Sequence, residues 1–153
     1  MRIPITKEGY EKLKRERDYL FSKKRPEILR AIEEARAHGD LSENAEYDAA
    51  KEEYQFLQKR ITEIEEMLKS CQIVEPSGSS LSCVFGSKVT LRNVETEEEV
   101  VYRIVGPYES DVKAGKISIT SPLGKALIGK SVGDEVRFSA PSGEKVYEIL
   151  KIE

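Results

Sequence analysis

Two carboxylates stand close together in a short break between two highly charged stretches of this sequence. Asp40 and Glu43 flank Leu41 and Ser42, and Asn44 follows directly. Two carboxylates alone bind a divalent cation weakly, and Mg²⁺ prefers one or two of them combined with water and the phosphate oxygens of a substrate. The pair therefore suits a shared site, in which a partner already holds one metal ion and hydrolyses a phosphodiester with two.

The same acids also have a purely local interpretation. Gly39 is the residue type that ends a helix in the left-handed conformation. Asp40 and Glu43 have the spacing of a capping box at the start of a following helix, where acids also complement the helix dipole, and Ser42 is an alternative cap. From spacing alone this capping role is favoured over catalysis. Capping does not explain Leu41, an apolar residue at an exposed turn.

A calcium-binding EF-hand loop is excluded by position. Counted from Asp40, the sixth residue is Ala45 where the loop needs Gly, and the twelfth is Lys51 where it needs Glu. The single His of the chain likewise excludes a zinc site built on histidines. The expected metal is therefore a weakly held Mg²⁺ that the chain shares with a partner, with no cofactor bound by the chain alone.

Composition limits the class of protein. The 153 residues are 35% charged and 39% hydrophobic, and their net charge is −3. This balance fits long solvated helices with a modest core, but not electrostatic binding of nucleic acid by the whole molecule. Cys71 and Cys83 form no CxxC pair and are expected to be reduced thiols of a cytoplasmic protein. The sequence shows no signal peptide and no apolar run of about 20 residues, so no membrane partner is expected.

A heptad pattern dominates the segment after the acids. Its apolar positions alternate in spacing between three and four residues, with charged residues between them, which predicts a long helix that packs along one seam. These positions are Tyr47, Ala50, Tyr54, Leu57, Ile61, Ile64, Leu68 and Cys71. A helix of roughly 30 residues would be about 45 Å long.

A less regular seam precedes the acids, and a kink or break is expected near Pro26. The short link between two long helices predicts an antiparallel hairpin with its tip at residues 39–44. Alanines near the tip are expected to let the backbones approach closely and keep the tip slender. The first seam consists of Tyr10, Leu13, Leu20, Ile28, Ala31 or Ile32, and Ala35, and the alanines are Ala31, Ala35, Ala37, Ala45, Ala49 and Ala50.

The pattern changes at a linker containing Pro, Ser and Gly, residues 76–81. We therefore expect an α+β chain with a coiled-coil hairpin at 1–75 and a second domain at 82–153. Alternating β-branched residues in the second domain predict a small, mainly antiparallel sheet. Ser121 and Pro122 are typical of an N-cap and a first helical residue, and predict one short helix. The strands are expected at 88–92, 100–105, 116–120, 135–138 and 145–150.

Several stretches of the chain resemble the bacterial Gre transcript cleavage factors, in particular their GreA type. The most specific stretch is ARAHGDLSENAEY at 35–47, and RPEI at 25–28 precedes it. In the second domain the likeness is carried by residues 84–91, 102–106 and 117–130. Because the resemblance runs in order along essentially the whole chain, it makes a functional role for the two acids more convincing than their spacing alone does.

The resemblance implies a function. The hairpin would enter the secondary channel of bacterial RNA polymerase, and the C-terminal domain, FKBP-like in fold, would dock on the channel rim. Asp40 and Glu43 match the family's catalytic acids, which help to hold a second Mg²⁺ and orient the attacking water. The polymerase itself would then cut the extruded RNA 3′ end of a backtracked complex. The chain would be an accessory elongation factor, not an enzyme, and is expected to be a monomer.

Basic residues on both arms near the tip could neutralise phosphates of that RNA. Arg36 and Lys51 match basic positions of the family, whereas for Arg30 a solvated pair with a neighbouring Glu is an equally good explanation. Tyr47 could stack on a base, but its place at the start of the heptad seam favours core packing.

Three other functions remain open. An inhibitory Gre paralogue would occupy the channel without promoting cleavage, but such proteins depart from the family at the tip, where the acid pair is intact here. A prolyl isomerase would need an aromatic-lined pocket, and the second domain offers only Phe85, Phe138 and its few Tyr residues. A plain coiled-coil adaptor would be indifferent to substitution of both acids.

Overall fold

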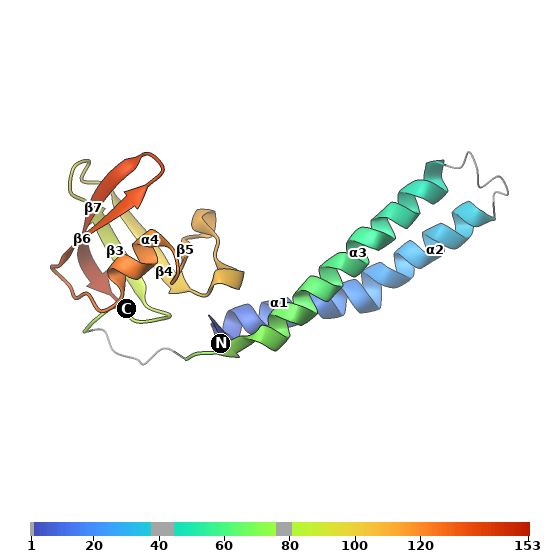
Figure 1. The fold of residues 1–153 in the computed structure, drawn as a ribbon, viewed down its shortest axis with the longest axis horizontal. Coiled ribbons are helices and arrows are strands. Elements are labelled where there is room, and N and C mark those ends of the chain that lie inside the picture. Colours follow the sequence, from blue (N-terminus) through green and yellow to red (C-terminus); the bar gives the residue numbers. More distant parts are fainter. Residues whose placement is uncertain (1, 38–44, 76–80) are drawn as a thin grey trace. The chain divides into compact units, whose positions relative to one another are not determined.

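The computed structural model describes residues 2–37, 45–75 and 81–153, and the chain divides into two compact units (Figure 1). The hairpin unit is Tyr10–Ser70, and the β unit combines Met1–Gly9 with Cys71–Glu153. The long helical segments are α1 (Lys7–Tyr19), a π-helical turn η1 (Leu20–Lys24), α2 (Arg25–Arg36) and α3 (Ala45–Ser70).

The heptad seam of α3 packs against the first arm as predicted. Figure 1 shows α2 and α3 side by side, and the structure confirms that their contact is close. Ile28 of α2 is buried together with Leu57 and Ile61 of α3. Partly buried side chains pack around these three, namely Leu20, Ile32 and Tyr54. The antiparallel helical hairpin is therefore confirmed.

Only some of the alanines near the tip lie in the seam. Ala35 of α2 and Ala50 of α3 are 3% and 7% exposed, so small side chains do line the close approach of the two helices. For the other alanines the expectation was wrong, because in an antiparallel pair only one stripe of each helix faces the partner. The exposed ones are Ala31, Ala37, Ala45 and Ala49. Ile32 takes the seam position for which Ala31 was the alternative.

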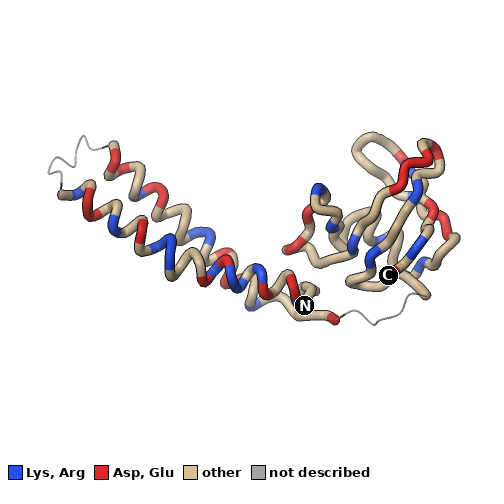
Figure 2. The backbone as a smooth tube through the Cα atoms, turned by 180° about the vertical axis from the view of Figure 1, so that it is seen from behind, with Lys and Arg blue, Asp and Glu red and all other residues tan. Residues whose placement is uncertain are grey.

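Ion pairs join the two arms beside the apolar seam. The Arg60 guanidinium donates to both carboxylate oxygens of Glu16, at 2.8 and 3.1 Å, and its other nitrogen lies 3.7 Å from Glu63. Lys24 lies 3.7 Å from Glu53. Figure 2 shows acidic and basic residues interspersed along both arms, so the hairpin surface is charged but not of one sign.

The interruption expected near Pro26 is the π-helical turn η1. The backbone stays in the right-handed helical region on both sides of the turn, so the helix does not break. Leu20 follows Leu13 by seven residues, but Ile28 follows Leu20 by eight. A π turn accommodates one extra residue, and this turn therefore keeps the seam on the side that faces α3.

The same turn lies directly before the proline, and its hydrogen bonds are shifted by one residue. Pro26 has no N–H to donate to the carbonyl four residues earlier. The Arg25 N–H donates to the Leu20 carbonyl, five residues back, and the Ser22 hydroxyl donates to the Asp18 carbonyl at 2.5 Å. A change of helix type thus replaces the break that the sequence suggested.

The β unit includes a two-stranded parallel sheet that the sequence did not predict. Strand β1 (Ile3–Ile5) pairs with β2 (Cys71–Ile73). The seam assignment of Cys71 was wrong, because α3 ends at Ser70 and Cys71 opens β2, where it is nevertheless buried. Periodicity cannot reveal such short strands, because three residues contain too little pattern.

The main sheet has five strands in the order β5-β4-β3-β7-β6. Three of its four pairings are antiparallel, but β4 and β5 are parallel, so the sheet is mixed and not wholly antiparallel. The 3₁₀ turns η2 (Pro107–Glu109) and η3 (Val112–Ala114) form the connection that lets β5 return in the direction of β4. The strands are β3 (Lys88–Asn93), β4 (Glu99–Val105), β5 (Lys116–Ser118), β6 (Glu135–Ala140) and β7 (Gly143–Ile152).

The predicted short helix covers the sheet. Helix α4 (Pro122–Leu127) begins as expected, because the Ser121 hydroxyl accepts from the Gly124 N–H at 3.0 Å and Pro122 occupies the first turn. Leu123 and Leu127 join the core of the β unit. That core also contains Cys83, Val89, Leu91, Ile104, Ile117, Val136, Tyr147, Ile149 and Ile152.

Candidate functional site

The acids singled out in the sequence belong to the connection between α2 and α3. Helix α2 ends at Arg36, after which the Ala37 N–H donates to the Glu33 carbonyl at 3.0 Å, and α3 begins at Ala45. The predicted tip residues lie outside the described residues. They are Asp40, Leu41, Ser42, Glu43 and Asn44. The structure therefore defines the ends of the two arms from which these residues extend.

Two arginines of α2 are exposed near that end. Arg30 and Arg36 form no ion pair with any residue in the described ranges 2–37, 45–75 and 81–153. The solvated Glu pair considered for Arg30 is therefore not formed there. Arg36 also lies in the last turn of α2, where a cation complements the negative end of the helix dipole. Both guanidinium groups are available to a phosphate ligand.

The third basic residue, Lys51, lies beside Tyr47 on the same helix. The Lys51 ammonium lies 5.2 Å from the centre of the Tyr47 ring, one helical turn away on α3. Tyr47 is half-buried. The face of an aromatic ring attracts a cation electrostatically. Lys51 is thus exposed to solvent, and its ammonium is attracted to the Tyr47 ring.

The first turn of α3 carries acidic residues, Glu46 and Asp48, at the positive end of the helix dipole. Their charge partly offsets the three cations of the arms, so attraction to RNA would be local and short-ranged. Among the described residues no group of three or more His, Cys, Asp or Glu could hold a metal ion. Asp40 and Glu43 are the only oxygen donors that we consider for Mg²⁺, and carboxylates suit that ion.

The two cysteines have no place in this site. Neither forms a disulfide, and both are buried. Burial is the main cause that raises the pKa of the Cys83 thiol to about 11, and burial also raises the pKa of the Cys71 thiol. Neither sulfur is therefore a reactive thiolate. Their reduced state agrees with the expectation from the sequence.

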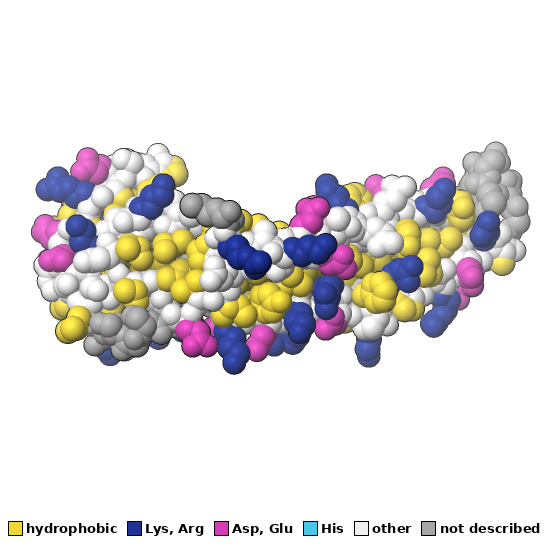
Figure 3. Space-filling model, turned by 60° about the horizontal axis from the view of Figure 1, so that its bottom comes forward, with side chains coloured by type: hydrophobic (Ala, Val, Ile, Leu, Met, Phe, Trp, Pro, Cys, Tyr) yellow, Lys and Arg dark blue, Asp and Glu magenta, His cyan; other side chains and the backbone are white. Residues whose placement is uncertain are grey.

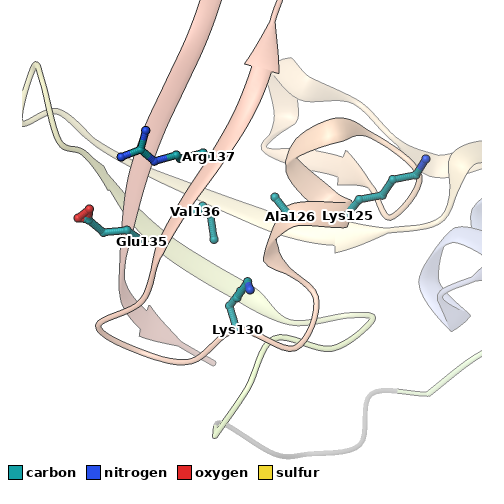
Figure 4. Close-up of a pocket in the computed structure, with 6 residues that line it drawn as sticks. All are labelled: Lys125, Ala126, Lys130, Glu135, Val136 and Arg137. Carbon is teal, nitrogen blue, oxygen red and sulfur yellow. The ribbon is translucent and has the colours of Figure 1, made fainter.

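A hollow of about 440 Å³ lies on the β unit between α4 and β6 (Figure 4). Lys125, Lys130 and Arg137 line it, and Ala126 and Val136 lie among them. In Figure 4 the side chains of Lys125 and Arg137 extend in opposite directions, so the cations do not converge on one anion. None of the described residues that line this hollow is aromatic, so it lacks the floor that a prolyl isomerase pocket would need.

Sequence reasoning missed one contact at the start of the helical region. Glu109, in η2, accepts hydrogen bonds from Thr6, the residue that precedes α1. The only signal in the sequence was the residue type of Thr6, which is favoured as an N-cap. Nothing in the sequence connected it to a carboxylate so far along the chain.

Both halves of the chain match known families. Residues 3–73 match the model described as transcription elongation factor, N-terminal, and residues 81–153 match transcription elongation factor, GreA/GreB, C-terminal. Together with the helical hairpin and the small sheet, these matches define a transcription elongation factor of two parts. No helix of the described residues is long and apolar enough to cross a membrane.

Relatives extend the match over the full chain. The transcription elongation factor GreA of Thermodesulfovibrio yellowstonii is 55% identical, covering 99% of this chain and 96% of the relative. That of Syntrophobacter fumaroxidans is 52% identical, covering 99% and 97%. The crystal structure of GreA factor homolog 1 of Thermus thermophilus is 30% identical, with a TM-score of 0.46 and coverage of 100% and 99%.

The chain belongs to the GreA/GreB family, the transcript cleavage factors that act with RNA polymerase and are not enzymes by themselves. The resemblance noted from the sequence is thereby confirmed.

Proposed function

We propose that the hairpin enters the secondary channel of bacterial RNA polymerase and brings Asp40 and Glu43 to the polymerase active site. There it stimulates cleavage of backtracked RNA by the polymerase and rescues arrested complexes. The observation that carries this proposal is the place of the acid pair. It lies in the connection between two helices that form a two-stranded hairpin, and two helices are the thinnest helical support that buries a seam.

The two acids would act as oxygen ligands and as acceptors of hydrogen bonds from water. Mg²⁺ shared with the polymerase would supply Lewis-acid assistance to hydrolysis of the phosphodiester. Asp40 and Glu43 would complete the set of oxygens around it and orient the attacking water. Two carboxylates are too few donors to retain the ion by themselves, so the cation is expected only in the complex.

The cations at the arm ends fit a role in holding the extruded RNA. Arg36 and Arg30 on α2 and Lys51 on α3 are exposed, and the two arginines are free of ion pairs within the described residues. Each phosphate contact would add a salt-dependent share of affinity. Tyr47 is half-buried and lies beside the Lys51 ammonium, so its ring is only partly open to a base.

The remaining parts of the proposal concern organisation. We place the hairpin domain at 1–75, the linker at 76–81 and the polymerase-docking domain at 82–153, which agrees with family matches that end at residue 73 and begin at residue 81. The docking domain would bind the channel rim. We expect a cytoplasmic monomer, because its partner is the polymerase.

The test is cleavage of RNA in a stalled, backtracked polymerase complex, across a Mg²⁺ titration. Wild type should shorten the RNA, while Asp40→Asn and Glu43→Gln should lose activity yet still compete with wild type for the polymerase. Higher Mg²⁺ should partly restore at least one of the two variants. Equal activity of all three proteins would contradict the role of the acids and favour a plain adaptor.

An inhibitory paralogue is the second candidate, and the same gel distinguishes it. Such a protein would bind the polymerase and slow elongation without any shortening of RNA by wild type. The identity of 52% and 55% to GreA proteins over nearly the full chain favours the cleavage factor. The intact acid pair favours it as well.

A further inference from the structure

The start of helix α1 is capped by a buried threonine. The Gly9 N–H donates to the Thr6 hydroxyl oxygen at 3.1 Å, which satisfies one of the N–H groups that a helix leaves free in its first turn. Thr6 is only 5% exposed. An ordinary cap lies at the surface, so a buried cap indicates that another part of the chain covers it.

The group that covers this cap is the carboxylate of Glu109, 103 residues further along the sequence. One oxygen of Glu109 accepts the Thr6 N–H at 2.7 Å and the Gly106 N–H at 3.0 Å. Its other oxygen accepts the Thr6 hydroxyl. Hydrogen bonds to an ionised acceptor are stronger than those between neutral groups. Glu109 thus binds both the backbone and the side chain of the residue that begins α1.

Two glycines allow this approach. A Cβ on Gly9 would lie 2.2 Å from a carboxylate oxygen of Glu109, and a Cβ on Gly106 would lie 1.9 Å from the Pro4 carbonyl oxygen. The second clash involves backbone on both sides and has no flexible group to relieve it. The N-terminal segment and η2 are therefore packed at backbone distance, with Glu109 between them.

We call this arrangement the Glu109 clamp. Its hydrogen bonds join Thr6, the residue before α1, to the turn η2. Strand β1, which precedes Thr6, pairs with β2, which directly follows the last residue of α3. The clamp therefore acts at the place where the first helix of the chain begins and the last helix of the hairpin ends.

We propose that Glu109 is a positioning residue for transcript cleavage, because it fixes through Thr6 the point at which α1 begins. This inference rests on the function proposed above. Catalysis that depends on carboxylates at the end of a long hairpin is sensitive to small displacements at its start, and a misplacement of about 1 Å can cost about a hundredfold in rate. In this role Glu109 itself contacts neither RNA nor metal.

The first experiment tests the clamp in the free protein by amide hydrogen exchange at Thr6 and Gly9. Glu109→Gln and Thr6→Val should each speed exchange at these amides by about tenfold or more, as expected for loss of a charge-assisted hydrogen bond. Thr6→Ser keeps the hydroxyl and should exchange like wild type. Glu97→Gln, at an exposed turn of the same unit, is the matched control. Unchanged exchange in Glu109→Gln would overturn the proposal.

The second experiment separates positioning from docking in the cleavage assay. The factor is titrated against a backtracked complex, and the plateau rate is read apart from the concentration that gives half of it. If Glu109 acts by positioning, Glu109→Gln and Thr6→Val should lower the plateau by about tenfold and leave the half-saturating concentration within about twofold. Thr6→Ser should restore the plateau. Circular dichroism at the assay temperature should show the same folded sheet in every variant.

The outcomes distinguish this inference from the function on which it rests. A wild type that cleaves, with an undiminished plateau in a variant whose clamp amides exchange fast, overturns the positioning role alone. Equal damage from Thr6→Ser and Thr6→Val overturns it too, because the hydroxyl would then be irrelevant. A wild type that never shortens RNA overturns both proposals, while the exchange data still report whether the clamp exists.

Discussion

The two units of this protein bury their apolar residues in different ways. In the β unit, eleven buried side chains form a cluster between the main sheet and a helix, with Leu91, Ile104 and Ile149 completely buried. The hairpin has a single seam, in which Ile28, Leu57 and Ile61 form a small cluster, and ion pairs beside it. Figure 3 shows apolar side chains reaching the surface between charged ones along the hairpin. Stability is therefore concentrated in one unit, while the candidate chemistry belongs to the other.

The largest effect should follow from a cavity in the β unit. Leu91→Ala removes a fully buried side chain from the sheet and should lower the free energy of unfolding by about 3 to 5 kcal/mol, because surrounding strands cannot collapse into the space. Calorimetry on this variant and on Val101→Ala, a 45% exposed control in the neighbouring strand, measures the difference. If Leu91→Ala lowered the free energy of unfolding only slightly, the buried cluster would not be the main source of stability in the β unit.

A cavity in the hairpin seam should cost less. Ile61→Ala should lower the free energy of unfolding of the hairpin by about 2 kcal/mol, the low end of the range for such changes, because two helices can move together more easily than sheet strands. Helical ellipticity against temperature follows the hairpin, with exposed Thr62→Ala as the control. If Ile61→Ala proved as costly as Leu91→Ala, the contrast between the units would fail.

The same contrast explains what the sequence could reveal. Long heptad periodicity located the hairpin, and β-branched alternation with the Ser121 cap located the main sheet and α4. Short or non-local features stayed hidden. Strands β1 and β2 are too short for a pattern, and the parallel pairing of β5 depends on where a connection folds. Local signals do not encode partners that are distant along the chain.

The candidate site could be predicted from the sequence less completely than the fold. Spacing alone favoured capping for Asp40 and Glu43, and only the resemblance to a family suggested catalysis. The pairing of Lys51 with Tyr47 was foreseeable from a four-residue spacing on one helix. The contact between Thr6 and Glu109 was not, because the two residues are 103 positions apart in the sequence. Chemistry performed with a partner leaves few traces in the contacts of one chain.

A smaller effect is expected from removing the π turn. Deleting Ser22 shortens the step from Leu20 to Ile28 to one heptad, and Pro26→Ala in the same protein restores the missing N–H. The combined variant should form an uninterrupted α-helix and gain about 1 kcal/mol of hairpin stability. Deleting Lys59 from the regular heptads of α3 is the control, and it should destabilise strongly. If both deletions lowered hairpin stability equally, the π turn would not be the feature that accommodates the extra residue.

The smallest effect should come from the ion pair across the arms, and it has a defined pH dependence. Hydrogen bonds from Arg60 hold the pKa of the Glu16 carboxyl below its usual value, although partial burial of that carboxyl acts in the opposite direction. A carboxyl with a lowered pKa stabilises the folded state above its pKa in the unfolded chain, and this contribution disappears as the pH falls through the folded pKa.

Hairpin stability should therefore decline on acidification from pH 7 to pH 3 by less in Glu16→Gln than in wild type. The difference should stay below about 1 kcal/mol, because the side chains of Arg60 and Glu16 are 40% and 37% exposed and water screens the pair. Urea unfolding followed by helical ellipticity measures it, with exposed Glu66→Gln as the control. High salt should reduce the difference further. A wild type whose decline matched that of Glu16→Gln would show that the seam alone holds the two arms together.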